Sequence, residues 1–116
     1  AFEVSPDRIG ALFEHLVFNQ ISTSAAARDI DVRICSFRTE HGAEVDLVVE
    51  VGREVWAIEL KASHKVARGA TGGLRAFADY HGKKHHPMVL YLGAVAREID
   101  AIPVLPWQQG IKTMGL

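Results

Sequence analysis

The side chains best suited by type to do chemistry are three acids and one lysine. Asp46 lies in one strand-like run, and Glu59 and Lys61 stand two residues apart in the next. Glu14 lies in a helix-like run before them. Carboxylates bind Mg²⁺ or Mn²⁺, and the bound metal can lower the pKa of a water and neutralise charge on a phosphate. With Lys61 to orient that water or stabilise the transition state, the set suits metal-assisted cleavage of a phosphodiester bond.

The run 55–62 is predicted to be a strand with one apolar and one chemical face. Side chains alternate across a strand, so Glu59 and Lys61 share a face. The opposite face carries apolar residues: Trp56, Ile58 and Leu60. Folding alone does not explain a carboxylate and an ammonium in line near the end of such a strand. The pattern acid-x-Lys is nonetheless common, and by itself it more often marks a solvated cross-strand ion pair.

The preceding run 44–51 is predicted to be the hairpin partner, because Gly52 and Arg53 form a tight turn between the two runs. Its alternation places Glu44 and Asp46 on one face. The other face would carry Val45, Leu47 and Val49. If the register sets Asp46 near Glu59, the two carboxylates repel unless a cation or a proton lies between them.

Glu14 stands at the border of an apolar helical stripe, with Val17, Phe18 and Ile21 three, four and seven residues later. A carboxylate without a partner is costly there, and a place in the metal shell, directly or through water, would satisfy it. Glu44 is an extra acid near the site and could instead pair with Arg38 across the hairpin.

Periodicity predicts an α/β fold with a mixed sheet flanked by helices, in the order αβββαβ plus a short final strand. Ser5, Pro6 and Asp7 start the first helix, which runs to about residue 26. A first strand covers 32–38, and a second helix ends near Gly82. The run 88–92 is apolar on both faces, which favours a central strand parallel to the third. The final piece, 102–104, is expected at an edge because Pro103 cannot donate to a ladder.

Composition is that of one ordinary globular domain, with 116 residues, 48% of them hydrophobic and 23% charged. No apolar run is long enough to cross a bilayer and no basic-then-apolar leader opens the chain, so a cytoplasmic location without a membrane partner is expected. The single cysteine, Cys35, is interpreted as a small buried apolar group.

Charge is unevenly distributed along the chain. Residues 1–60 hold eleven acids against five bases, whereas 61–97 hold seven bases against one acid. A polyanion would meet the second stretch more readily, although a solvated basic face is about equally common. The expected phosphate contacts are Lys65, Arg68, Arg75, Lys83 and Lys84. His81, His85 and His86 lack a further ligand at zinc spacing, which favours an exposed basic loop over a zinc site.

Several spaced blocks together resemble a known family. They are Gly10-Ala-Leu-Phe-Glu14, Phe37-Arg38-Thr39, Gly42-Ala-Glu44-Val-Asp46, Ala57-Ile-Glu59-Leu-Lys61-Ala-Ser63 and Ile102-Pro103-Val104. They look like the uncharacterised C-terminal domain appended to many prokaryotic AAA-type ATPases, which is similar to the PD-(D/E)XK nuclease superfamily. The likeness runs from about residue 8 to 107. It implies a restriction-endonuclease-like fold in which Glu14, Asp46, Glu59 and Lys61 match the active-site pattern.

Two function hypotheses follow from this resemblance. The preferred one is a magnesium-dependent or manganese-dependent nuclease domain that acts on nucleic acid, with DNA as the first candidate, attached to an ATPase. The chain opens at Ala1 rather than at a methionine, which fits the C-terminal part of a longer ATPase chain. The alternative is a catalytically inactive module that binds nucleic acid or a protein and regulates the ATPase.

Overall fold

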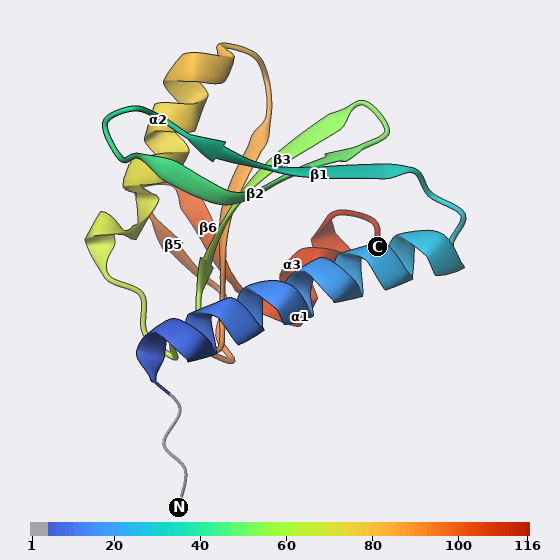
Figure 1. Ribbon diagram of the computed structural model, residues 1–116, viewed down its shortest axis with the longest axis horizontal. Helices are drawn as coiled ribbons and strands as arrows, with labels where there is room; N and C mark the ends of the chain where they lie inside the picture. The colour runs from blue at the N-terminus through green and yellow to red at the C-terminus, as the bar shows by residue number, and fades with distance from the viewer. Residues whose placement is uncertain (1–4) are drawn as a thin grey trace, which may run out of the picture.

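A sheet of six strands forms the centre of the fold, with helices on both of its faces (Figure 1). The computed structural model describes residues 5–116. Across the sheet the strands lie in the order β1-β2-β3-β4-β6-β5. The elements are α1 (Pro6–Ala27), β1 (Val32–Arg38), β2 (Glu44–Val51), β3 (Glu54–Lys61), η1 (Arg68–Thr71), α2 (Gly72–His81), β4 (His86–Tyr91), β5 (Arg97–Ile99), β6 (Ile102–Pro106) and α3 (Trp107–Thr113). The expected mixed α/β architecture is confirmed.

The first helix begins as its sequence predicts. The hydroxyl of Ser5 accepts a hydrogen bond from the backbone N–H of Arg8 at 3.3 Å, and Pro6 takes the first helical turn. One stripe of α1 is buried at four-residue spacing: Phe13, Val17, Ile21 and Ala25. This stripe fixes which flank of the helix faces the sheet and therefore where Glu14 points.

Two apolar cores lie on opposite faces of the sheet (Figure 1). The first packs α1 and α3 against the sheet, and its sheet residues are Leu47, Val49, Ile58, Leu60, Met88 and Leu90. The second packs α2 against the other face, and its sheet residues include Val45, Val48, Ala57, Val89, Tyr91 and Val104. β4 contributes to both cores and runs parallel to β3, as predicted.

The predicted alternation of β2 is wrong at its beginning. Val45 packs in the α2 core, whereas Leu47 and Val49 pack in the α1 core. The pairing with β1 shows why: three steps on β2, from Val48 to Val45, oppose two steps on β1, from Cys35 to Phe37. The extra residue is a β-bulge, which breaks the two-residue period and re-aims the side chains around it.

The end of the chain also differs from the prediction. β6 is an inner strand, and the outer position belongs to the three-residue β5. Pro103 is tolerated because it lies opposite Glu98 of β5, one residue before the pairing with β4 starts at Val104. The helix α3 was not predicted, and it depends on a tertiary contact: a Cβ at Gly110 would lie 2.0 Å from a methyl carbon of Leu90.

Two further properties concern the surface. Cys35 is exposed on the outermost strand β1, so its interpretation as a buried group is wrong. Within residues 5–116, no helix combines the length and apolar character needed to cross a membrane.

Candidate functional site

The candidate site lies where β2 and β3 separate. β2 pairs with β1 as far as Glu44, opposite Arg38, but it pairs with β3 only as far as Leu47. Asp46 stands in the resulting opening, and its Oδ2 accepts a hydrogen bond from the backbone N–H of Leu60 at 2.8 Å. The carboxylate of Asp46 therefore accepts a hydrogen bond that the carbonyl of a neighbouring strand would otherwise accept. Because Leu60 lies on β3 between Glu59 and Lys61, this bond fixes Asp46 beside the other site residues.

Glu59 is largely enclosed, with 12% of its side chain exposed. Burial raises the pKa of Glu59 to about 8, and the negative charge of Asp46 and a hydrogen bond with the Asp46 side chain add to the rise. The charge of Lys61 opposes it, and that of Glu44 adds a smaller increase. The Asp46 side chain is thus near enough to Glu59 to act on its ionisation.

Lys61 lies beside this pair, with Nζ 3.7 Å from Oε1 of Glu59. The side chain of Lys61 is 42% exposed, so it borders solvent far more than the Glu59 side chain that it contacts. A substrate that approaches from solvent would meet Lys61 first. This is the position expected for a cation that binds a phosphate oxygen.

Glu14 reaches the same opening from α1. It lines a cavity of about 270 Å³ together with β1 and β2 residues: Ser36, Phe37, Arg38, Glu44, Val45 and Asp46. Burial raises the pKa of Glu14, and the charges of Asp46 and Glu44 raise it further. The helix and the two strands therefore bring Glu14 within electrostatic reach of Asp46 and Glu44.

Glu44 borders this cavity and has a partner of its own. Its Oε2 lies 3.0 Å from Nη2 of Arg38 across the β1–β2 hairpin, which confirms the predicted pairing. The backbone of Glu44 is also held from the other face, because a Cβ at Gly73 would lie only 1.9 Å from its carbonyl oxygen. The close approach of α2 at Gly73 therefore keeps the start of β2 in place.

A match to a family model accompanies this geometry. The model described as "Domain of unknown function (DUF4143)" matches residues 9–109. The chain belongs to the DUF4143 family. No curated protein and no solved structure matches the chain. Membership confirms the expectation of an uncharacterised domain, while kinship to nucleases stays a prediction.

The acids of this DUF4143 domain suit a small hard cation. Within residues 5–116, no three Asp, Glu, His or Cys side chains gather closely enough to hold a metal between them. Mg²⁺, however, is commonly held by one or two carboxylates with waters filling the other positions. The pair Asp46 and Glu59 fits that requirement, and Glu14 lines a cavity together with Asp46, where a water could connect the two.

The predicted phosphate contacts do not gather at one place. Lys65 and Arg68 follow β3 directly and lie at the site end of the domain. Lys83 and Lys84 precede β4, whose first residue pairs with Trp56 near the start of β3. Lys61 lies five residue steps along β3 from Trp56, which corresponds to about 16 Å. The two lysines therefore belong to the opposite end of the sheet.

Arg75 and the histidines have other partners. Arg75 forms an ion pair with Asp100 in the β5–β6 turn. His86 Nε2 lies 2.6 Å from Oε2 of Glu54, and His81 and His85 pack their rings around Phe77.

Sequence reasoning missed the means by which Asp46 reaches its place. It also missed Ser36, which lines the cavity beside Glu14. The run Glu44–Val51 carries no glycine or proline to mark a bulge. Ser36 sits among the strand-like residues of β1, and its only signal is a hydroxyl next to the block Phe37-Arg38-Thr39.

Proposed function

We propose that this domain is a magnesium-dependent phosphodiesterase that acts on nucleic acid. Asp46 and Glu59 would hold the ion, Glu14 would support it through water, and Lys61 would act as the catalytic cation. The observation that carries the proposal is the enclosed acid pair beside Lys61, in which Glu59 has a pKa of about 8. Attachment to an AAA-type ATPase remains part of the proposal through the family resemblance stated above.

The acid pair is hard to explain by stability alone. Two carboxylates that share an enclosed place destabilise each other, and an apolar pair of similar volume would suit the surrounding core better. A divalent cation or a proton removes the repulsion. The high pKa of Glu59 shows that the chain without metal favours a proton there. A site kept in this state is suited to exchange that proton for a cation.

Each residue has a defined task in the proposed reaction. The backbone N–H of Leu60 holds Oδ2 of Asp46 in place and so fixes the orientation of the carboxylate toward the ion. Glu59 loses its proton when a cation binds, and Lys61 donates to a phosphate oxygen as negative charge develops there. The bound metal would supply a water of lowered pKa and neutralise phosphate charge.

Cleavage of a fluorescent DNA oligonucleotide in Mg²⁺ or Mn²⁺ tests the proposal, with an RNA of the same sequence beside it. Asp46→Asn, Glu59→Gln and Lys61→Met should each lower the rate at least 100-fold. Glu50→Gln is the matched control. Glu50 also lies on β2, but away from the opening, and its Oε2 is 3.9 Å from Nη1 of Arg33 on β1. Equal rates in the site variants and the control would contradict the proposal.

The runner-up function is a catalytically inactive module that binds nucleic acid or a protein and regulates the ATPase. The observation in its favour is that no three potential metal ligands gather closely within residues 5–116. Metal titration by calorimetry separates the two functions. Mg²⁺ or Mn²⁺ binding that is lost in Asp46→Asn supports the enzyme, whereas nucleic-acid binding without metal binding at millimolar concentration supports the module.

A further inference from the structure

One flank of α1 carries a row of side chains at four-residue spacing: Leu12, Leu16, Gln20, Ser24 and Arg28. Residues four apart are neighbours on a helix surface, so the row is continuous. Its first half is apolar and open, because Leu12 is 56% and Leu16 is 46% exposed. Its second half is polar and lines a cleft between α1 and α3. The flank thus changes from apolar to cationic along the helix.

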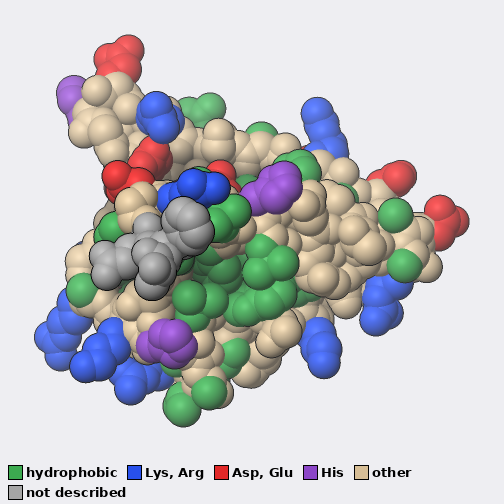
Figure 2. All heavy atoms as spheres, turned by 60° about the horizontal axis from the view of Figure 1, so that its bottom comes forward, with side chains coloured by type: hydrophobic (Ala, Val, Ile, Leu, Met, Phe, Trp, Pro, Cys, Tyr) green, Lys and Arg blue, Asp and Glu red, His purple; other side chains and the backbone are tan. Residues whose placement is uncertain are grey.

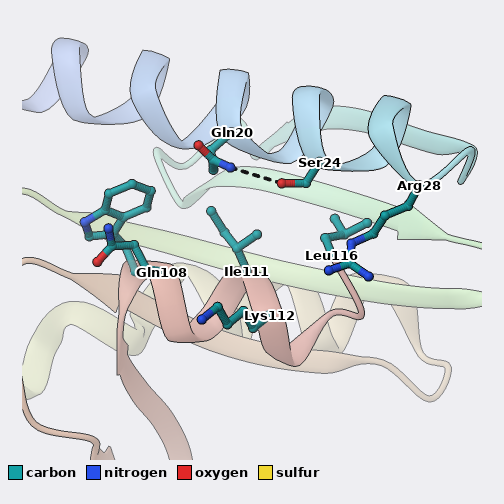
Figure 3. Close-up of a pocket in the computed structure, with 8 residues that line it drawn as sticks. Gln20, Ser24, Arg28, Gln108, Ile111, Lys112 and Leu116 are labelled. Carbon is teal, nitrogen blue, oxygen red and sulfur yellow. Dashed lines mark hydrogen bonds between the residues drawn. The ribbon is translucent and has the colours of Figure 1, made fainter.

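The cleft has a volume of about 530 Å³. In Figure 3 the side chains of Gln20, Ser24 and Arg28 extend from α1 toward α3, and Ile111 and Leu116 lie between the two helices. The buried side chains of Ile111 and Leu116 form an apolar floor, while the amides, the hydroxyl and two cations form the walls. A side chain with an apolar stem and a polar end could therefore contact the apolar floor and the polar walls at the same time.

Arg28 and Lys112 are the cations of this cleft. Over residues 5–116, neither forms an ion pair, and no Asp or Glu side chain lines the cleft. Each cation lies at the C-terminal end of its helix, where the helix dipole favours positive charge. The dipole explains the choice of residue, but it does not supply an acidic side chain to neutralise either charge. The complementary occupant is anionic.

The apolar half of the row indicates which kind of anion fits. Ile9 is exposed beside Leu12 and Leu16, and hydrophobic side chains gather at the centre of the face that carries α1 (Figure 2). Trp107 lines the cleft, and its ring packs edge-on against that of Phe13, the next residue after Leu12, with 6.3 Å between the ring centroids. A nucleic-acid backbone offers no apolar surface to cover these side chains. A protein segment can offer both carboxylates and apolar side chains.

We propose that this flank of α1, together with α3, is a docking groove for an acidic amphipathic segment of a partner protein. From Leu12 to Arg28, the C-cap residue of α1, the row covers 17 residues, or roughly 24 Å along the helix axis, which suits a bound helix of about four turns. Apolar side chains of the segment cover Leu12 and Leu16, and its Asp or Glu side chains bind Arg28 and Lys112. The groove lies on a different flank from Glu14, so it does not depend on the proposed phosphodiesterase.

Selection of a random 16-residue peptide library, displayed on phage, against the full chain tests the groove. The enriched peptides should combine Leu, Ile or Phe at helical spacing with Asp or Glu toward one end. Fluorescence anisotropy of synthetic copies should then show at least tenfold weaker binding to Arg28→Gln/Lys112→Gln and to Leu12→Ser/Leu16→Ser. Arg53→Gln/Lys83→Gln removes two cations elsewhere and should leave the affinity unchanged.

Weaker binding to a variant could also result from poor folding of that variant, so the peptide is changed as well. Copies in which Gln replaces each Asp and Glu should lose the same tenfold affinity for the unmodified chain. The proposal is overturned if selection yields no binder, if the binders lack acids, or if their affinity survives the Arg28→Gln/Lys112→Gln change. It is also overturned if a single-stranded oligonucleotide displaces the peptides, or if sedimentation shows a dimer that Leu12→Ser/Leu16→Ser dissociates.

Discussion

The Oδ2 atom of Asp46 accepts a hydrogen bond from the backbone N–H of Leu60 at 2.8 Å. One carboxylate thus has a structural and a chemical task, because it closes the end of the β2–β3 ladder and faces Glu59. The bond explains how a residue on a bulged strand is held in one orientation. It also allows the two tasks to be separated by substitution.

Asp46→Asn and Asp46→Ala should differ in stability but not in chemistry. Asn keeps an oxygen that accepts from the N–H of Leu60, whereas Ala leaves that part-buried N–H unpaired at a loss of about 1–3 kcal/mol. Both variants lack the charge that a cation needs. Urea unfolding should show the loss for Ala alone, and calorimetry should show lost Mg²⁺ binding for both. Equal stability of the two variants would show that the hydrogen bond contributes nothing.

Glu59 should make stability fall as pH rises. The folded chain keeps the Glu59 proton up to a pKa of about 8, whereas the unfolded chain releases it near 4.5. Between these values the folded state binds one more proton than the unfolded state, so the free energy of unfolding decreases with rising pH. Glu59→Gln cannot ionise and should flatten the profile between pH 4.5 and 8. Thermal unfolding across that range, without divalent ions, provides the comparison.

Mg²⁺ binding should release a proton. The ion binds the ionised carboxylate, so at pH 6.5 it must displace the proton that Glu59 carries. Apparent affinity should therefore rise by up to tenfold per pH unit toward pH 8 and level off above it. Calorimetry in two buffers of different ionisation heat would count close to one proton per ion. Binding that is independent of pH would remove Glu59 from the metal site.

The sequence alone is sufficient to predict those elements whose start or end is marked by neighbouring residues. The helix start at Ser5 and Pro6, and the turn at Gly52 and Arg53, follow from short-range rules that tertiary packing did not override. The sequence left the approach of Asp46 to Glu59 conditional on the register of the hairpin, which alternation alone does not give. Alternation placed Val45 with Leu47, and the bulge separates them.

The remaining features depend on partners distant in sequence. The bulge exists because β2 must pair with β1 on one side and separate from β3 on the other. The helix α3 packs where Gly110 meets Leu90, and β6 lies inside the sheet because β5 covers it. The residues of α3 do not indicate that it packs on Leu90, and those of β6 do not indicate that β5 lies beside it. The opposite-end position of Lys83 and Lys84 likewise follows only from the parallel register of β3 and β4.

Gly73 should be far less replaceable than its neighbour Gly72. A Cβ at Gly73 would lie 1.9 Å from the carbonyl oxygen of Glu44, whereas a Cβ at Gly72 meets nothing within 4 Å. Gly73→Ala must push α2 away from the start of β2, at a loss of about 1–3 kcal/mol. Gly72→Ala should be neutral or stabilise the helix by about 0.5–1 kcal/mol, since alanine restricts the unfolded chain.

The displacement should also reach the site, because Glu44 is two residues from Asp46 on the strand that α2 holds. Gly73→Ala should weaken Mg²⁺ binding and shift the amide resonances of residues 44–46 and 60 in a two-dimensional NMR spectrum, whereas Gly72→Ala should leave both unchanged. If Gly73→Ala lost stability but kept metal affinity and these resonances, the contact with α2 would support the fold without positioning the acids.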